Sequence, residues 1–163
     1  MNYKVNAQDL GLNPRDARSA AQALNEYLAN LMVLFVKVHN LHWNVVGQSF
    51  FDIHAKTQEL YEHIGDEIDV IAERVKMLGY YPTGSLSEAL QLSTIKELPN
   101  DIHPNGPSVA KVVVDDLQTI IRQLREISEN NDSAYTGGLV EEALTYYEKL
   151  HWLFSAYLTK EKE

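Results

Sequence analysis

Imidazole and carboxylate side chains are concentrated in one part of the sequence, between residues 39 and 73. Four of the six histidines lie there, namely His39, His42, His54 and His63. A series of polar residues follows at steps of three and four, a spacing that places them on one helix face: His54, Gln58, Glu62, Asp66, Asp69 and Glu73. Imidazole and carboxylate together suit iron, zinc or manganese. A solvated acidic helix face is the alternative, and the spacing alone leaves both interpretations open.

The spacing along this helix limits how a metal ion could be bound. Asp69 and Glu73 are four residues apart and can hold one ion between them. His54 precedes Asp69 by 15 residues, which is about 22 Å along a helix. One chain therefore cannot bring both to one metal, whereas two copies packed antiparallel about a two-fold axis could. His42 lies on the apolar face of the preceding helix, where a hydrogen-bonded core histidine is the alternative to a ligand.

Another pair with ligand spacing occurs near the end of the chain. Glu148 and His151 form a Glu-x-x-His unit, which ferritins use twice inside each bundle. The unit occurs once here, and residues 50–79 offer no matching partner. We interpret the pair as helix-surface residues and do not expect a metal site inside the bundle of one chain.

Helical periodicity fills most of the chain and must position these side chains. Apolar residues at steps of three and four predict four long helices. They run from Asn13-Pro14 to Gly47, from about Phe50 to Gly79, over residues 109–127 and over residues 139–157. Residues 80–107 are rich in Pro and Gly, and Ser85 with Glu88 forms a capping box that predicts a short helix around 86–92. The layout predicts an all-α, ferritin-like four-helix bundle with a short helix in the long middle connection.

Composition and charge restrict the class of function. The 163 residues are 45% hydrophobic, which predicts one domain over 1–163, with 1–13 as a short N-terminal tail. Fourteen basic against 23 acidic residues leave a net charge of −9, which disfavours nucleic acid binding through bulk charge and favours cations. The absence of cysteine excludes disulfides and thiolate metal sites. With no signal peptide pattern and no apolar run long enough to span a membrane, we expect a cytoplasmic protein without a membrane partner.

Three segments together resemble a known family. They are His39-Asn-Leu-His42-Trp43-Asn-Val, Phe50-Phe-Asp-Ile-His54 and Asp69-Val-Ile-Ala-Glu73-Arg74. The sequence is similar to the Dps family, the DNA-protection-during-starvation miniferritins, over almost its whole length. The resemblance implies a homo-oligomeric shell of twelve four-helix subunits. Such a shell is a ferroxidase-type oxidoreductase, which oxidises Fe(II), usually with hydrogen peroxide in preference to oxygen, and stores the ferric iron in its cavity.

The resemblance also implies a di-iron centre at the two-fold interface. Its ligands would be His42 and His54 of one subunit with Asp69 and Glu73 of the partner subunit, Glu73 bridging the irons. The family usually has an acidic ligand four residues after the second histidine, where this chain has Gln58. An amide brings no charge, so we expect a weaker second iron position, for which Glu62 is a possible substitute ligand.

The remaining family features are less complete in this sequence. Trp43 and Trp152 match family tryptophans near the centre, where the resemblance implies that an aromatic ring can absorb stray oxidising equivalents. Interface packing is the alternative role, and we put it first. An expected acidic position of the three-fold pore is Gly138, although other acids lie nearby, at Asp132, Glu141 and Glu142. DNA-binding members often carry a Lys-rich tail, whereas residues 1–20 hold only Lys4, Arg15 and Arg18, and 160–163 is charge-balanced. Direct DNA binding is therefore not expected.

Three functions are alternatives to iron oxidation and storage. They are a metal-sequestering shell with weak catalysis, a nucleoid DNA-binding protein and a helical interaction module.

Overall fold

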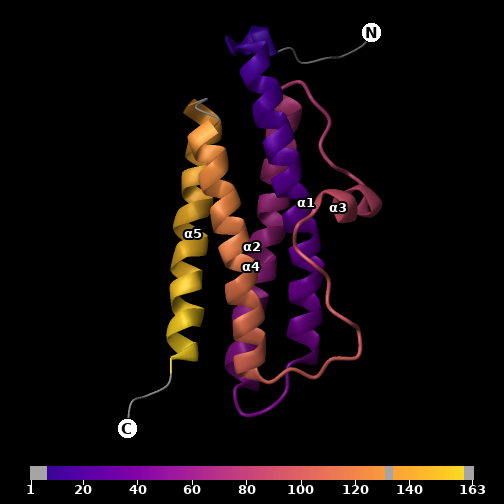
Figure 1. Cartoon of the computed structure of the whole chain (residues 1–163), viewed down its shortest axis with the longest axis vertical. Coiled ribbons are helices and arrows are strands. Elements are labelled where there is room, and N and C mark those ends of the chain that lie inside the picture. The colour runs from indigo at the N-terminus through magenta and orange to yellow at the C-terminus, as the bar shows by residue number, and fades with distance from the viewer. Residues whose placement is uncertain (1–6, 131–133, 160–163) are drawn as a thin grey trace.

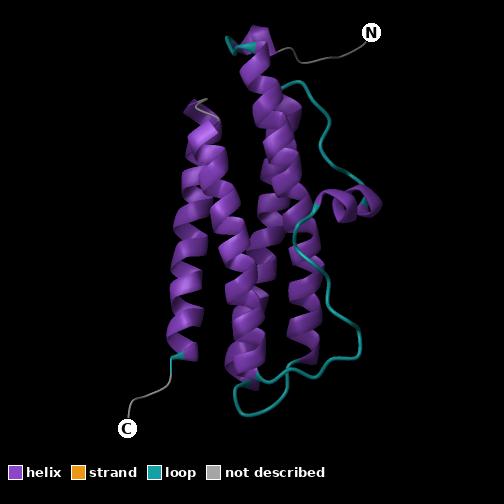
Figure 2. Cartoon of the chain, in the orientation of Figure 1, coloured by secondary structure: helices purple, strands orange, loops and turns teal. Residues whose placement is uncertain are grey.

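The computed structural model describes residues 7–130 and 134–159 of the chain. A 3-10 helix, η1 (Ala7–Leu10), precedes the α-helices, which are α1 (Pro14–Asn44), α2 (Phe50–Met77), α3 (Leu86–Leu92), α4 (Gly106–Asn130) and α5 (Ala134–Leu158). The four long helices lie side by side, and the short α3 stands beside α1 in the connection that crosses from α2 to α4 (Figure 1). Over the described residues Figure 2 shows helices and loops but no strand. The predicted all-α bundle with a short crossover helix is confirmed.

Local sequence signals set the helix ends. Asn13 caps α1 by accepting a hydrogen bond from the Arg15 backbone N–H at 2.9 Å, and Pro14 occupies the first helical position. Ser85 caps α3 in the same way, accepting from the Glu88 N–H. Gly79, at φ +90°, ends α2 in the left-handed region that disfavours other residues.

Two helices begin earlier than their apolar patterns predict. The fourth long helix, α5, starts at Ala134 rather than Leu139 and includes Gly137 and Gly138. Glycine costs about 1 kcal/mol in a helix interior, and the buried Thr136 and Val140 on either side of the pair anchor this turn to the bundle. Helix α4 starts at Gly106, inside the stretch predicted to be irregular.

Apolar side chains on the inner faces of the long helices form one core. Helix α1 packs along α2, and α4 packs along α5. The core includes the residues whose spacing predicted the helices, among them Leu24, Leu28, Leu31, Val38, Leu60, Ile64, Val75, Val113, Leu117, Ile120 and Leu124. No described helix has the combined length and apolar character that a membrane-crossing segment needs.

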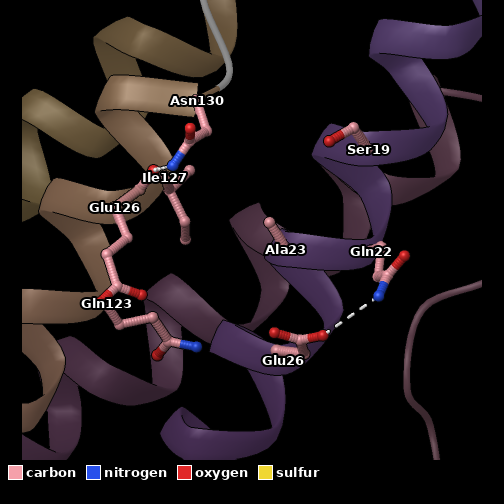
Figure 3. A pocket seen from close by; sticks show the side chains of 8 residues that line it. All are labelled: Ser19, Gln22, Ala23, Glu26, Gln123, Glu126, Ile127 and Asn130. Carbon is pink, nitrogen blue, oxygen red and sulfur yellow. Dashed lines mark hydrogen bonds between the residues drawn. The ribbon is translucent and has the colours of Figure 1, made fainter.

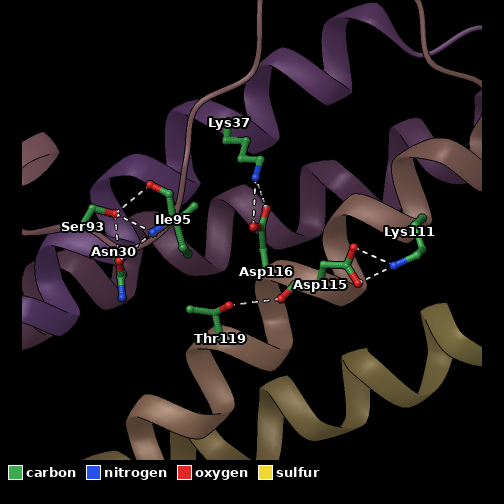
Figure 4. A network of polar contacts seen from close by, with 8 residues as sticks. All are labelled: Asn30, Lys37, Ser93, Ile95, Lys111, Asp115, Asp116 and Thr119. Atoms are coloured by element: carbon green, nitrogen blue, oxygen red, sulfur yellow. Dashed lines mark hydrogen bonds and ion pairs between the residues drawn. The ribbon is translucent and has the colours of Figure 1, made fainter.

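Buried polar contacts fix the crossover connection and α4 against α1. The buried Asn30 side chain accepts hydrogen bonds from the Ser93 hydroxyl and the Thr94 backbone N–H, both at 2.8 Å. About two turns further along α1, Lys37 forms a buried ion pair with Asp116 of α4 at 2.7 Å (Figure 4). Because such groups are costly to bury without partners, these contacts specify a single register of α1, the connection and α4.

Candidate metal centre

His42 and His54 face each other where α1 ends and α2 begins. Their rings stack with centroids 3.6 Å apart and planes inclined by 19°. The short turn between the helices makes this possible, because Gly47, at φ +101°, reverses the chain within a few residues. Both histidines predicted as ligands are thus brought together by one chain.

Hydrogen bonds hold both rings in one tautomer. His42 Nδ1 lies 2.9 Å from the His54 carbonyl oxygen, and His54 Nδ1 lies 2.9 Å from the His42 carbonyl oxygen. A carbonyl oxygen can only accept, so each Nδ1 carries the hydrogen and donates it. In the neutral imidazole each Nε2 then carries the free lone pair, which is the form in which histidine binds a metal.

Thr57 adds a further contact to this arrangement. Its hydroxyl donates to the Ile53 carbonyl oxygen at 2.7 Å, and its oxygen lies 3.1 Å from His42 Nδ1. The hydroxyl oxygen can therefore accept a second branch of the His42 N–H bond. Sequence reasoning missed this residue, although the signal was present: a hydroxyl three residues after His54 falls on the buried side of α2.

The surroundings of His42 favour its neutral form. The side chain is buried, and this burial lowers its pKa below the ordinary 6.5. The Tyr61 and His42 rings meet edge to face with their centroids 5.2 Å apart. The Phe50 ring stacks on His54 with a centroid separation of 4.9 Å. A neutral imidazole is available for coordination over a wider range of pH than an exposed one would be.

The predicted acidic ligands lie elsewhere on the same chain. Asp69 and Glu73 are exposed on α2, 15 residues or more beyond His54. Gln58 and Glu62 are also exposed, and the Gln58 amide donates to the Glu62 carboxylate at 2.8 Å. Within the described ranges of one chain, no three His, Asp or Glu side chains converge to hold a metal ion. The chain therefore presents a stacked histidine pair and, about 22 Å along α2, a separate pair of carboxylates.

The other histidines and the Glu-x-x-His unit do not join the pair. His39 donates from Nδ1 to the Phe35 carbonyl oxygen at 2.8 Å and stacks on Tyr61. Glu148 forms an ion pair with Arg125 of α4, and His151 lies against Gln118. Glu148 is exposed and His151 half-buried, so the interpretation of this unit as part of the helix surface agrees with their contacts.

A groove between α1 and α4 lies away from the histidines. It has a volume of about 290 Å³ and is lined by α1 and α4 residues that include Gln22, Glu26, Gln123 and Glu126 (Figure 3). Glu26 precedes His42 by 16 residues, roughly 24 Å along α1. The groove contains no histidine, and its open polar walls do not form a ligand cage.

The remaining predicted features lie on the surface. Trp43 and Trp152 are 69% and 63% exposed, which a second subunit could cover. Gly138, Glu141 and Glu142 are exposed near the start of α5. Asp132 and Lys4, named above for the pore and the tail, lie outside the described residues, as does segment 160–163.

The sequence is similar to known proteins over most of its length. A model of the ferritin-like domain matches residues 21–163. The chain is 34% identical to a DNA protection during starvation protein of Helicobacter pylori, over 84% of this chain and 96% of that protein. The chain belongs to the Dps family. A Dps protein of Brevibacillus brevis is 35% identical, over 85% of this chain and 93% of its own length.

Solved structures agree with this assignment. The crystal structure of a Dps protein from Vibrio cholerae, described as a member of the ferritin-like diiron-carboxylate superfamily, covers 98% of this chain and 100% of its own, with a TM-score of 0.87 and 31% identity. The Staphylococcus aureus Dps structure covers 88% of this chain with a TM-score of 0.82 and 31% identity. Membership of the family supports a miniferritin role in iron handling and stress protection, exercised as an oligomer.

Proposed function

We propose that this protein oxidises Fe(II) at a di-iron centre shared between two subunits and stores the ferric product inside a twelve-subunit shell. One observation carries the proposal. The His42 and His54 rings are locked as Nδ1–H tautomers with both Nε2 atoms available, while the carboxylates that would complete the site are too far along α2 to reach them. The half-site needs a second copy of the chain, and a two-fold axis supplies two complete sites at once.

In this proposal each residue has a distinct role. The imidazoles of His42 and His54 are neutral donors that leave open positions on iron for the oxidant. Asp69 and Glu73 of the partner subunit supply the negative charge that attracts Fe(II), and Glu73 bridges two ions. Two Fe(II) ions then give one electron each to hydrogen peroxide, which with two protons yields two Fe(III) and two water molecules. This stoichiometry releases no hydroxyl radical, and it is the basis of the proposed protection from oxidative damage.

The assembly and location follow the same proposal. The whole chain, residues 1–163, acts as one domain within a dodecamer in the cytoplasm. The exposed Trp43 and Trp152 are expected to be covered at subunit contacts. Direct DNA binding does not form part of the proposal, because a subunit charge of −9 opposes contact with phosphates.

Subunit complementation tests whether the centre is shared. His42→Gln removes a ligand from the imidazole half, and Glu73→Gln removes one from the carboxylate half. Each variant alone should lose fast peroxide-driven oxidation of Fe(II), measured anaerobically on the metal-free protein at two irons per site. When the two variants are dissociated, mixed and reassembled, each mixed pair contains one intact centre and one doubly damaged centre.

The two outcomes separate the models. Recovery of oxidation in the mixture, in proportion to the share of mixed pairs, supports a centre between subunits. A mixture as inactive as its parents means that all ligands come from one chain, which overturns the proposal. Each variant mixed with itself under the same treatment controls for damage during reassembly.

The second iron position has its own test at Gln58. Its amide donates to Glu62, so the Glu62 carboxylate is held beside Gln58, eight residues or about two turns beyond His54. Gln58→Asp should tighten binding of the second Fe(II), whereas Gln58→Asn shortens the side chain without adding charge and serves as the matched control. If wild-type protein binds iron but oxidises it no faster than buffer does, the metal-sequestering shell is the better description.

A further inference from the structure

A buried carboxylate with two phenols lies at the centre of the bundle, apart from the histidine pair. Tyr27 of α1 donates to Glu67 of α2 at 2.6 Å, and Tyr147 of α5 donates to the other oxygen of the same carboxylate. Both tyrosines are fully buried, and Glu67 is nearly so. We call these three residues the Tyr–Glu–Tyr cluster.

The cluster has features that packing alone does not require. Apolar residues of similar volume often stabilise a core as well as a buried charged group does, and apolar side chains pack around the two tyrosines. Glu67 also borders a surface pocket that contains His63 and Glu142. The carboxylate instead accepts a short hydrogen bond from each of two phenols that water does not reach. A phenol in such a contact can lose an electron while its proton crosses the existing hydrogen bond, so no buried cation is formed.

The position of the cluster relates it to the proposed iron centre. Glu67 precedes Asp69 by two residues, about 3 Å along the helix axis. The two side chains point to opposite sides of α2, since Glu67 faces the core and Asp69 faces solvent. An iron ion held by Asp69 and Glu73 would thus be separated from the cluster by roughly the 10 Å diameter of one helix.

We propose that the Tyr–Glu–Tyr cluster is a one-electron reservoir for peroxide reduction when only one iron ion occupies the shared centre. The inference rests on the proposed function, and the amide at Gln58 is the reason why such a reservoir would be needed. Because the usual acidic ligand is absent at that position, single occupancy is expected to be common. One Fe(II) can give peroxide only one electron, and the second would otherwise be taken from an arbitrary nearby group by a hydroxyl radical.

The reaction balances with the cluster as the second donor. One Fe(II), one peroxide, one tyrosine, the Glu67 carboxylate and two protons give one Fe(III), one neutral tyrosyl radical, a protonated Glu67 and two water molecules. The phenol proton passes to the Glu67 carboxylate as the electron leaves. A second Fe(II) later returns an electron to the radical, Glu67 returns the proton, and the sum is again two Fe(III) and two waters for each peroxide.

The same residues are poorly suited to hold a metal ion themselves. Burial raises the pKa of both Tyr27 and Tyr147 well above 10, so neither offers a phenolate. The nearest imidazole, His63, lies 3.7 Å from Glu67 and is stacked on Tyr146. Within the described part of the chain, no group of three His, Asp or Glu side chains that could hold a metal is present here.

Electron paramagnetic resonance tests the inference. Metal-free protein receives one Fe(II) per proposed centre, then peroxide, and is frozen within milliseconds to seconds. We expect a tyrosyl spectrum in the wild type that is lost in Tyr27→Phe combined with Tyr147→Phe. Tyr81→Phe is the matched control, because Tyr81 is 84% exposed and its ring contacts Lys76. This substitution should leave the signal unchanged. An unchanged signal in the double variant, or no tyrosyl signal in the wild type, overturns the inference.

A measurement on the wild type covers the case in which the double variant fails to fold. A radical in the cluster keeps a hydrogen bond from protonated Glu67, so its spectrum should contain one strong coupling to an exchangeable proton that disappears in D₂O. A radical on an exposed tyrosine lacks this defined coupling, and that result also counts against the cluster.

Two controls separate this inference from the proposed function. Ferric absorbance recorded on the same samples reports iron oxidation, so fast oxidation without a tyrosyl radical rejects the reservoir and leaves the ferroxidase proposal intact. In an iron-free experiment, flash-generated tris(bipyridine)ruthenium(III) is the oxidant. The cluster predicts a long-lived tyrosyl radical there, lost in the double variant, whether or not the protein oxidises iron. Equal radical decay in both proteins overturns the inference.

Discussion

Replacing Thr57 with Val tests whether the hydroxyl group orients the His42 ring for the proposed metal binding. The substitution keeps the shape of the buried side chain but removes the oxygen that lies 3.1 Å from His42 Nδ1. Loss of a partner behind a ligating histidine typically weakens metal binding by 10- to 100-fold. The His54 carbonyl oxygen still accepts from the same Nδ1 at 2.9 Å, so we expect the lower end of this range. A tenfold loss corresponds to about 1.4 kcal/mol.

Calorimetric titration of the metal-free oligomer with Zn(II), a probe that does not change oxidation state, measures this effect. Anaerobic Fe(II) titration gives the same comparison with the proposed substrate. Thr57→Ser restores the oxygen and should bind nearly as tightly as the wild type. The reasoning is refuted if Thr57→Val binds Zn(II) as tightly as the wild type does. It is equally refuted if the Ser variant is as weak as the Val variant, because the oxygen would then not be the cause.

Three further predictions concern stability. Asp116→Asn leaves the Lys37 charge buried without its counter-ion, and the free energy of unfolding should fall by about 3–5 kcal/mol in urea titrations, whereas replacing both residues by apolar ones should cost far less. Asn30→Ala removes the oxygen that accepts from the Thr94 N–H and the Ser93 hydroxyl, and should cost about 1–3 kcal/mol. Hydrogen exchange should speed up in the crossover connection, and unchanged exchange there would refute the idea that Asn30 holds this connection against α1. Burial lowers the pKa of His42 in the folded chain below its ordinary value of 6.5. As the pH falls through 6.5, the unfolded chain therefore takes up a proton at this residue before the folded chain does. Acidification through this range should reduce the unfolding free energy of the metal-free protein, and His42→Gln should make that pH dependence shallower.

Local sequence signals were sufficient for the fold. The apolar spacing, the Asn13 cap, the Ser85 capping box and Gly79 each act within one or two turns, so they can be interpreted without knowing the rest of the chain. The start of α5 was placed too late for the same reason. Gly137 and Gly138 weaken the local helical pattern, and only the contacts of Thr136 and Val140 with the bundle show why the helix begins at Ala134.

The sequence also determined what one chain could not do. Fifteen residues of helix separate His54 from Asp69 whatever the tertiary structure, and that distance alone requires a second copy for a site that uses both. The residue types at these positions, including the amide of Gln58, are equally fixed by the sequence. Helix rise is a constant of the backbone, and for this reason a functional conclusion could be reached before any packing was known.

Tertiary structure alone decided the hydrogen bonding of the two histidines. The reciprocal bonds between His42 and His54 connect the Nδ1 atom of each ring to a carbonyl oxygen on the other helix. No local pattern encodes them, because they depend on the angle at which α1 and α2 meet. The same holds for Tyr27, Glu67 and Tyr147, which come from three helices and are separated by 40 and 80 residues. No pattern within its own helix marks any of the three, and only the packing of the bundle brings them into one hydrogen-bonded group.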